Sequence, residues 1–460
     1  MASSLSFNAG GLPVLPLPGS YGPPLLGPLK DRLDYFWFQG SETFFRQRAA
    51  TYKSTVFHRP RVIAVVDCAA FPALFDLSLV EKRDVLIGDF MPSTDFTGGM
   101  RVMVYMDPSE QKHNAGKAFC LDLLKRRARI WVSEFLLSTD VMLTTIEKEL
   151  SGATPCIFSF LCKSLAGADP ATCPEIADCG FAMLDKWLSL QILPTTSIGV
   201  LQPLEEIFLH SFAYPFALVK GNYQKLYDFL EKEGGEVIGM ATSEYGLTKE
   251  GALHNLLFIL GFNAFGGFSV FLPTLITTLG RDTTGLQGRL RAEVRRVLAG
   301  GRQLGFDTVR EMELVQSTVH EVLRMNPPVF LQYGRARKDF LLSSHEASFQ
   351  VRTGELLCGY EKLAMRDPKV FDDPETFNPD RYMGEKGRRL LDYLYWSNGP
   401  QTATHPRLTS SVLPRITCVT ACLLVAEIVR RYDDFAATEA PSPSPSWKRR
   451  LRRRRCQAPS

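Results

Sequence analysis

The sequence predicts a mainly α-helical fold with a minor β-sheet region, built as a single large domain. Three observations predict it. Hydrophobic residues make up 45% of the 460 positions and charged residues 22%, a balance typical of globular proteins. Long segments with apolar residues at helical spacing outweigh a few short β-branched runs. No linker divides residues 18–435, so we expect one domain there, with an extension at 1–17 and a tail at 436–460.

The predicted elements follow from periodicity and from residues that stop helices. Prolines between residues 17 and 28 favour extended and turning backbone, because proline disfavours helix at and before its own position. Apolar periodicity predicts helices over 31–52, 110–150, 251–280, 288–298, 311–325 and 418–432. Runs rich in branched and aromatic residues predict strands over 61–67, 339–342 and 348–352.

Charge and cysteine content exclude several classes of function. The formal net charge is +4, but the segment 448–455 reads KRRLRRRR, so the rest of the chain is slightly acidic and indicates no nucleic-acid partner. The Pro/Ser-rich and then basic tail from residue 436 is expected to be disordered. Ten scattered cysteines without metal-ligand spacing are typical of reduced thiols in a plastid or cytosol, and they predict no metal site of their own.

The first twenty residues lack Asp, Glu, Lys and Arg but contain several serines. An acid-poor, serine-containing start is typical of plastid transit peptides, although these usually also carry Arg. The absence of a positively charged beginning argues against a secretory signal. We therefore expect a plastid or cytoplasmic location.

The most apolar segment, residues 256–273, is long enough to span a bilayer. Asn263, Ser269, three glycines and a final proline argue instead for a buried central helix. Glycine inside a helix costs about 1 kcal/mol relative to alanine. Three of them suggest that something flat or bulky lies against this backbone, with a close helix crossing as the simpler explanation.

Two motifs lie in an order that points to a family. Glu321-Val-Leu-Arg324 places an acid and a base three residues apart on one helix face, where they can pair. Further along, after Asn-Pro-Pro ends this helix, the chain reads Phe-Asn-Pro-Asp-Arg381-Tyr. This order resembles the cytochrome P-450 superfamily. The resemblance implies a cytochrome P-450-like domain in which Glu321, Arg324 and Arg381 form a structural triad that braces the haem-binding segment.

Longer segments are similar to plant enzymes that cleave or rearrange fatty acid hydroperoxides. They include LPGSYGPPLLGPLKDRLDYFWFQG, MPSTDFTGG, LGFNAFGGFSVFLP, ELLCGYEKLAMRDPKVF and YWSNGPQT. This resemblance implies haem b as the cofactor and a fatty acid hydroperoxide as the substrate, with no need for a reductase, NADPH or dioxygen. Peripheral association with a membrane or with lipid is a further expectation from this resemblance.

The central helix carries the expected chemistry. Relatives that activate dioxygen have an acid and an alcohol there, whereas the stretch GFNAFGG from Gly261 has neither. Asn263 matches the family's pocket asparagine, which hydrogen-bonds the peroxide, and Ala264 and Phe265 are expected in the substrate pocket. Considered without the family, Asn263 would be a buried amide that satisfies the backbone.

Lys82, His113 and Lys117 match residues that contact the haem propionates in the family. Cations suit two carboxylates, and His113 and Lys117 stand four residues apart on one helix face. Taken as isolated residues, all three would be ordinary solvated surface groups.

Leu86 decides between two related reactions. Allene oxide synthases carry Phe at the matching position, where an aromatic face could stabilise a carbon radical long enough for its oxidation. Leu86 offers no π system, so we expect a hydroperoxide lyase that yields a short aldehyde and an ω-oxo acid. An allene oxide synthase-type dehydratase is the alternative, and the preference for 9- or 13-hydroperoxides stays open.

One essential residue of the family is missing. A haem-thiolate enzyme needs a cysteine as axial ligand, and counting back from Phe435 places it at Ser411 or Val412. Cys418 stands about two helical turns too late to replace it, and His405 supplies no thiolate. Relatives read NKQCAAKDY where this chain reads TSSVLPRIT from residue 409, and a one-nucleotide shift of frame converts the first into the second. We therefore expect weak haem retention, and a catalytically dead, haem-deficient relative is a further alternative.

Overall fold

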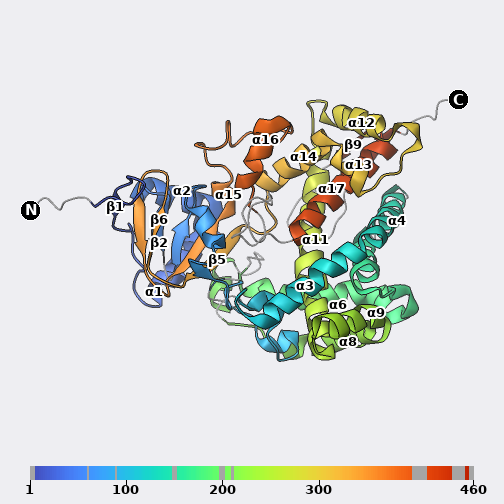
Figure 1. The fold of residues 1–460 in the computed structure, drawn as a ribbon, viewed down its shortest axis with the longest axis horizontal. Helices are drawn as coiled ribbons and strands as arrows, with labels where there is room; N and C mark the ends of the chain where they lie inside the picture. Colours follow the sequence, from blue (N-terminus) through green and yellow to red (C-terminus); the bar gives the residue numbers. More distant parts are fainter. Residues whose placement is uncertain are drawn as a thin grey trace, which may run out of the picture.

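The computed structural model describes residues 6–59, 62–86, 88, 91–147, 153–195, 202–208, 212–395, 412–437 and 451–454. Helices make up most of this chain, and short strands gather on the N-terminal side (Figure 1). The predicted class, mainly α with a minor β-sheet region, is confirmed.

Helix α17 (Val412–Arg431) lies at the centre of the helical part. It packs against α11 (Gly266–Gly280), α12 (Leu286–Val297) and α14 (Glu313–Met325). Nine of the 13 residues of α14 are buried and none is exposed, so this helix is enclosed in the core. The predicted helices over 288–298 and 311–325 correspond to α12 and α14.

Three consecutive segments, α10 (Lys249–Phe258), η10 (Ile259–Phe265) and α11, run on as one long helix. The middle segment η10 has the wider π-helical winding, which often marks functional sites. The helix from Lys249 to Gly280 is long and apolar enough to cross a membrane, but 61% of its most apolar window is buried inside the protein. It is therefore a core helix, as the sequence predicts.

Two sheets cover the N-terminal side. The larger has the order β2-β3-β8-β5-β4, in which β3 and β8 pair in parallel and the other neighbours are antiparallel. Every residue of β3 and of β8 is buried, which explains their continuous apolar runs. The smaller sheet has the order β1-β7-β6. The predicted strands correspond to β3, β6 and β7.

The bounds of the remaining elements are as follows. The strands of these sheets are β1 (Val14–Leu15), β2 (Val56–Arg59), β3 (Val62–Val65), β4 (Val80–Glu81), β5 (Leu331–Ala336), β6 (Phe340–Ser343), β7 (Ser348–Val351) and β8 (Leu356–Tyr360). The other α-helices are α1 (Leu26–Leu33), α2 (Ser41–Tyr52), α3 (Gln111–Arg126), α4 (Ala128–Glu147), α5 (Ala153–Leu161), α6 (Pro174–Ile192), α7 (Glu205–Phe208), α8 (Lys220–Glu233), α9 (Gly235–Tyr245), α13 (Phe306–Arg310), α15 (Glu361–Ala364) and α16 (Gly384–Leu390). Short 3-10 or π segments are η1 (Asp34–Phe38), η2 (Phe71–Phe75), η3 (Thr94–Thr97), η4 (Met103–Tyr105), η5 (Cys162–Ala166), η6 (Pro170–Thr172), η7 (Leu193–Thr195), η8 (Gln202–Leu204), η9 (Phe216–Leu218), η11 (Ala299–Gly301) and η12 (Leu391–Tyr393).

Two predicted helices are interrupted. The helix expected over 110–150 divides at Arg127, whose guanidinium donates hydrogen bonds to the backbone oxygens of Ser164 and Lys163 at 2.7 and 2.8 Å. The helix expected over 31–52 divides at Gly40, whose φ of 77° lies outside the helical range. Both breaks depend on conformation or distant contacts that apolar periodicity does not reveal.

Parts of both ends are ordered against the domain. In the extension, β1 pairs with β7. In the tail, β9 (Asp434–Ala437) pairs antiparallel with β10 (Leu451–Arg454), so these pieces of the region from residue 436 are strands rather than disordered chain. Phe435 of β9 is 8% exposed and packs in the main buried cluster, so this part of the tail is attached to the core. The rest of 436–460 lies outside the described residues.

Candidate functional site

Glu321 on α14 binds two arginines at once. Its carboxylate accepts hydrogen bonds from Arg324 at 2.7 and 2.8 Å and from Arg381 at 3.1 Å. Glu321 and Arg324 are 0% exposed and Arg381 is 9% exposed. Buried charges persist only when they are paired and hydrogen-bonded, as these are. The structure therefore brings the three residues of the predicted triad together.

The same arginines hold the backbone beyond α15. Arg324 donates to the oxygens of Met365 and Pro374 at 3.0 and 2.7 Å. Arg381 donates to three further carbonyl oxygens within residues 372–376. Ten or so residues of irregular backbone are thus fixed to α14 by side chains. This bracing lies upstream of the segment in which the family binds haem.

Asn263 lies in the π-helical segment η10 of the central helix. Its Oδ1 is buried and has no hydrogen-bond partner in the described chain. The sequence alternative, an amide that satisfies the backbone, therefore does not describe this oxygen. An unpaired buried acceptor is unfavourable and indicates a missing polar partner, as a peroxide would be.

The three glycines of this segment have different surroundings. A Cβ on Gly261 would lie 2.6 Å from the Trp187 ring and 2.8 Å from Leu184, so α6 crosses the helix closely at this point. A Cβ on Gly266 would approach Leu188 at 3.2 Å. A Cβ on Gly267 would meet nothing within 4 Å. Close crossing explains the first two glycines, and open space beside the third leaves room for a bound group.

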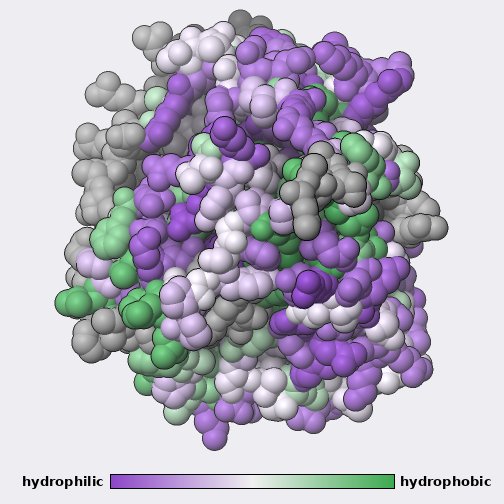
Figure 2. All heavy atoms as spheres, turned by 90° about the vertical axis from the view of Figure 1, so that its left-hand side faces the viewer, coloured by the Kyte–Doolittle hydropathy of each residue, from purple (hydrophilic) through white to green (hydrophobic). Residues whose placement is uncertain are grey.

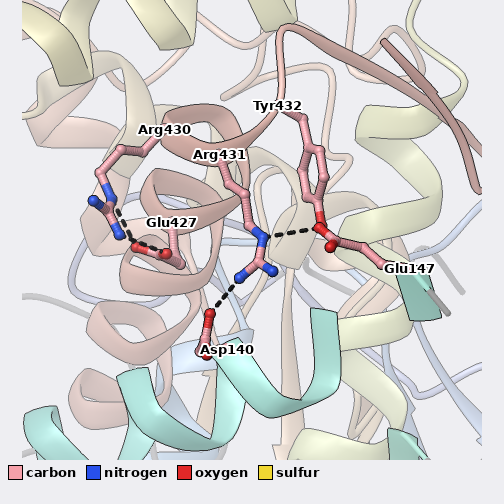
Figure 3. Close-up of a pocket in the computed structure, with 6 residues that line it drawn as sticks. All are labelled: Asp140, Glu147, Glu427, Arg430, Arg431 and Tyr432. Carbon is pink, nitrogen blue, oxygen red and sulfur yellow. Dashed lines mark hydrogen bonds and ion pairs between the residues drawn. The ribbon is translucent and has the colours of Figure 1, made fainter. Parts of the chain in front are cut away.

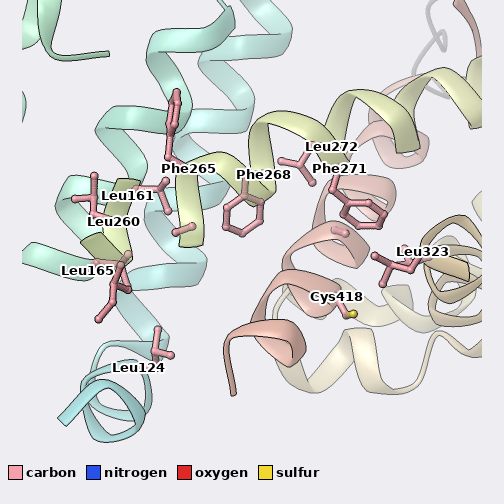
Figure 4. Packing of buried hydrophobic residues seen from close by; sticks show 14 of the residues in the cluster. Leu124, Leu161, Leu165, Leu260, Phe265, Phe268, Phe271, Leu272, Leu323 and Cys418 are labelled. Carbon is pink, nitrogen blue, oxygen red and sulfur yellow. The ribbon is translucent and has the colours of Figure 1, made fainter. Parts of the chain in front are cut away.

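The expected substrate-pocket residues are placed differently from one another. Leu86 is half-buried and packs against the main hydrophobic core, and Ala264 is 4% exposed. Phe265 is 1% exposed and its ring lies edge-on to Phe181, with centroids 5.3 Å apart. Figure 4 shows Phe265 among buried side chains of the core. Its ring is therefore packed between helices.

Lys82, His113 and Lys117 are all partly buried basic side chains. The Lys82 ammonium donates to the Tyr333 backbone oxygen at 2.5 Å, and burial lowers its pKa to about 8. Burial also lowers the pKa of His113 and of Lys117. In the described chain, no carboxylate lies within ion-pair distance of Lys82 or Lys117. Burial disfavours the charged form of these side chains, and a carboxylate such as a propionate placed beside them would favour it.

Haem fits this site on two sides. The basic side chains of Lys82 and Lys117 suit propionate carboxylates. The oxygen of Asn263, unpartnered in the described chain, and the open space at Gly267 suit a bound ligand. On the third side the thiolate is missing. Ser411 and His405 lie outside the described residues, as does the side chain of Val412, and the printed sequence has no cysteine among them.

Cys418 does not supply the missing ligand. It is 6% exposed and belongs to the same buried cluster as Leu323 and Phe271 (Figure 4). Burial raises the pKa of its thiol to about 12. Iron binds the thiolate rather than the thiol, so a cysteine in this environment is an inert core residue.

A charged pocket lies elsewhere, between the end of α17 and α4 (Figure 3). Its walls pair with one another: Arg430 binds Glu427 at 2.7 Å, and Arg431 binds Glu147 at 2.9 Å and also Asp140. It contains none of the predicted site residues. The pairs of Arg431 connect α17 with α4, the pair of Arg430 lies within α17, and together they leave no charge free for a ligand.

Comparison with known proteins gives the class first. Residues 281–402, which include the whole triad, match the model of the Cytochrome P450 family. The fold and the triad agree with that class.

Individual relatives show which group of cytochrome P450 proteins the chain resembles. The chain is 52% identical to "Linolenate hydroperoxide lyase, chloroplastic" of Arabidopsis thaliana over 92% of this chain and 91% of that protein. It is 53% identical to "Probable inactive linolenate hydroperoxide lyase" of the same species over 78% and 96%, and 40% identical to "Allene oxide synthase, chloroplastic" over 94% and 87%. The chain belongs to this family of cytochrome P450 hydroperoxide lyases and allene oxide synthases. The chloroplastic relatives support the plastid location expected from the N-terminal composition.

Sequence analysis missed the surroundings of Lys82. Glu361 at the start of α15 is 0% exposed, and both of its carboxyl oxygens lack a hydrogen-bond partner in the described chain. Burial raises its pKa well above the ordinary value, and in its charged form it would favour the protonated form of Lys82. A charged residue directly after the buried strand β8 was the available signal. Its meaning depends on pairing between β4, β5 and β8, which the sequence alone does not give.

Proposed function

We propose that this chain is a haem-dependent fatty acid hydroperoxide lyase of oxylipin biosynthesis. It would cleave polyunsaturated fatty acid hydroperoxides to a short aldehyde and an ω-oxo acid without dioxygen or NADPH. The observation that carries the proposal is 52% identity over 92% of the chain to a linolenate hydroperoxide lyase, against 40% to an allene oxide synthase. Asn263, with its unpartnered oxygen on a helix segment free of acid and alcohol, supports it.

The residues present can bind and orient such a substrate. The terminal O–H of a hydroperoxide can donate to Asn263 Oδ1, and the amide group of Asn263 can donate in return. Leu86 and Ala264 provide apolar surface for the acyl chain and exclude water. Haem, when bound, supplies the ferric iron at which an O–O bond can break. The sequence has no cysteine between residues 396 and 417 to supply the thiolate that would hold this iron.

The polypeptide as printed is expected to retain haem poorly. The decisive comparison is between this chain and a version in which residues 409–417 read NKQCAAKDY, with all other residues unchanged. We expect the changed version to show the Soret band of a CO-bound thiolate haem after reduction and to convert hydroperoxides into aldehydes. The printed chain should show neither.

Two outcomes would contradict these statements. A normal thiolate spectrum from the printed chain would show that haem retention does not require the replaced segment. A changed version that binds haem but leaves hydroperoxides intact would refute the lyase. Product analysis by mass spectrometry identifies allene oxide products if the chain is a dehydratase instead.

We further propose peripheral contact with lipid through α1 and η1. Leu25, Leu26 and Phe38 are 81%, 70% and 66% exposed. Arg32 of α1 binds Glu206 of α7 at 2.7 Å, so this surface is firmly attached to the domain. Figure 2 shows the side of the molecule on which these elements lie, and apolar side chains gather low on that face. Exposed apolar groups beside one another indicate an interaction surface.

A further inference from the structure

Tyr105 carries a buried hydroxyl with no hydrogen-bond partner in the described part of the chain. The residue is 2% exposed and ends the short helix η4. An unpaired buried hydroxyl is unfavourable, because folding removes the water that would otherwise bind it. Native proteins contain few such groups, and each requires a specific explanation.

A row of aromatic rings connects Tyr105 with the candidate site. Its ring lies edge-on to Phe258, with centroids 5.5 Å apart. Phe258 in turn stacks on Phe262, with centroids 4.8 Å apart and planes at 14°. Phe262 directly precedes Asn263 in η10. Two buried polar atoms without partners in the described chain, the Tyr105 hydroxyl and Asn263 Oδ1, therefore belong to residues at the two ends of this row.

The backbone around Tyr105 is held by two helices. The Trp187 indole of α6 donates to the Phe96 oxygen at 3.0 Å. The Met103 N–H donates to Asn255 Oδ1 of α10 at 2.7 Å. The second contact fixes the segment that ends at Tyr105 against the helix that continues into η10, and the first attaches the preceding segment η3 to α6. The hydroxyl is thus held in place relative to Asn263, as a binding residue requires.

The hydroxyl of Tyr105 is a donor under physiological conditions. Burial, assisted by the charge of Asp84, raises its pKa above the ordinary tyrosine value. A neutral phenol donates one hydrogen bond and suits an oxygen acceptor.

We propose that Tyr105 is a substrate-binding residue whose hydroxyl donates a hydrogen bond to the oxygen that an oxygenated fatty acid carries on its chain. This inference rests on the proposed function and adds a second polar contact to Asn263. It assigns the residue a role in recognising the oxygen rather than the acyl chain.

The test compares two 18-carbon acids that differ only in one hydroxyl on the chain, a stable stand-in for the hydroperoxide. Binding is followed by tryptophan fluorescence in the printed chain and in the version with NKQCAAKDY at 409–417. We expect Tyr105→Phe to weaken binding of the hydroxy acid about tenfold, the value of one hydrogen bond, and to leave the plain acid unchanged. Tyr35→Phe, which also removes a buried unpartnered hydroxyl, is the matched control and should change neither.

The outcomes separate this inference from the proposed function. If Tyr105→Phe binds both acids as the parent chain does, or weakens both equally, Tyr105 does not recognise the oxygen and the inference fails. If the parent chain binds neither acid, the proposed function itself fails and the inference with it. Because Phe keeps the ring, the urea midpoint should be unchanged or higher, and a lower midpoint would assign Tyr105 a structural role.

Discussion

At the scale of single residues, Glu321 is the group on which the site's support depends most. Glu321→Gln keeps the shape of the side chain but leaves two buried guanidinium groups without their counter-charge. Removing one partner of a buried pair costs about 3–5 kcal/mol, so we expect a loss of that size in the free energy of unfolding by urea. Glu385→Gln removes one partner of the exposed pair with Arg389 and should leave the midpoint unchanged. Equal, small effects of both substitutions would contradict the bracing role.

The triad could be predicted from the sequence, whereas its full set of contacts could not. Spacing places Glu321 and Arg324 on one helix face, and the family motif supplies Arg381. The carbonyl oxygens that these arginines bind belong to irregular backbone, which has no periodic signal. For the same reason Tyr105 was not predicted: its importance lies in a missing partner, which only coordinates reveal.

At the scale of elements, the central helix shows what glycine does in each position. Gly261→Ala would place a methyl group 2.6 Å from Trp187, so α6 or the helix must shift. Overpacking of this kind costs about 1–3 kcal/mol, and we expect that loss in urea unfolding. The control is Gly239→Ala in α9, where nothing lies within 4 Å and a gain of up to about 1 kcal/mol is expected. Stabilisation by Gly261→Ala would show that the helices are not in close contact there.

For the same helix, sequence patterns predict some structural features and not others. Its existence and burial follow from composition, because a long apolar run with Asn and Gly suits a core helix better than a membrane span. The π-helical winding of η10 does not follow, since one extra residue per turn leaves no trace in a glycine-rich apolar sequence. Yet this winding sets the direction of the Asn263 side chain, on which the geometry of the candidate site depends.

At the scale of the whole molecule, most parts of the expected haem site are present in the sequence, whereas the segment that should carry the axial cysteine is not. The fold and the triad are present, and the residues expected to contact the propionates, Lys82, His113 and Lys117, lie in described parts of the chain. The axial cysteine of the family would belong to one short segment, residues 409–417, where this chain has none. A local change of sequence there removes a ligand without disturbing the core, because α17 still packs against α4, α11, α12, α13 and α14. A chain of this kind is expected to fold even where it does not retain haem.

The exposed surface on α1 and η1 can be tested on the whole folded protein. We expect the double substitution Leu25→Glu with Leu26→Glu to reduce sedimentation with neutral lipid vesicles at least severalfold, because it replaces the most exposed apolar groups with charges. Leu137→Glu with Val141→Glu is the matched control on α4, where both residues are also exposed at 61% and 56%. The control should bind vesicles as the parent chain does. Equal losses in both variants would indicate general hydrophobic adhesion, and no loss in either would remove α1 as the lipid-contacting surface.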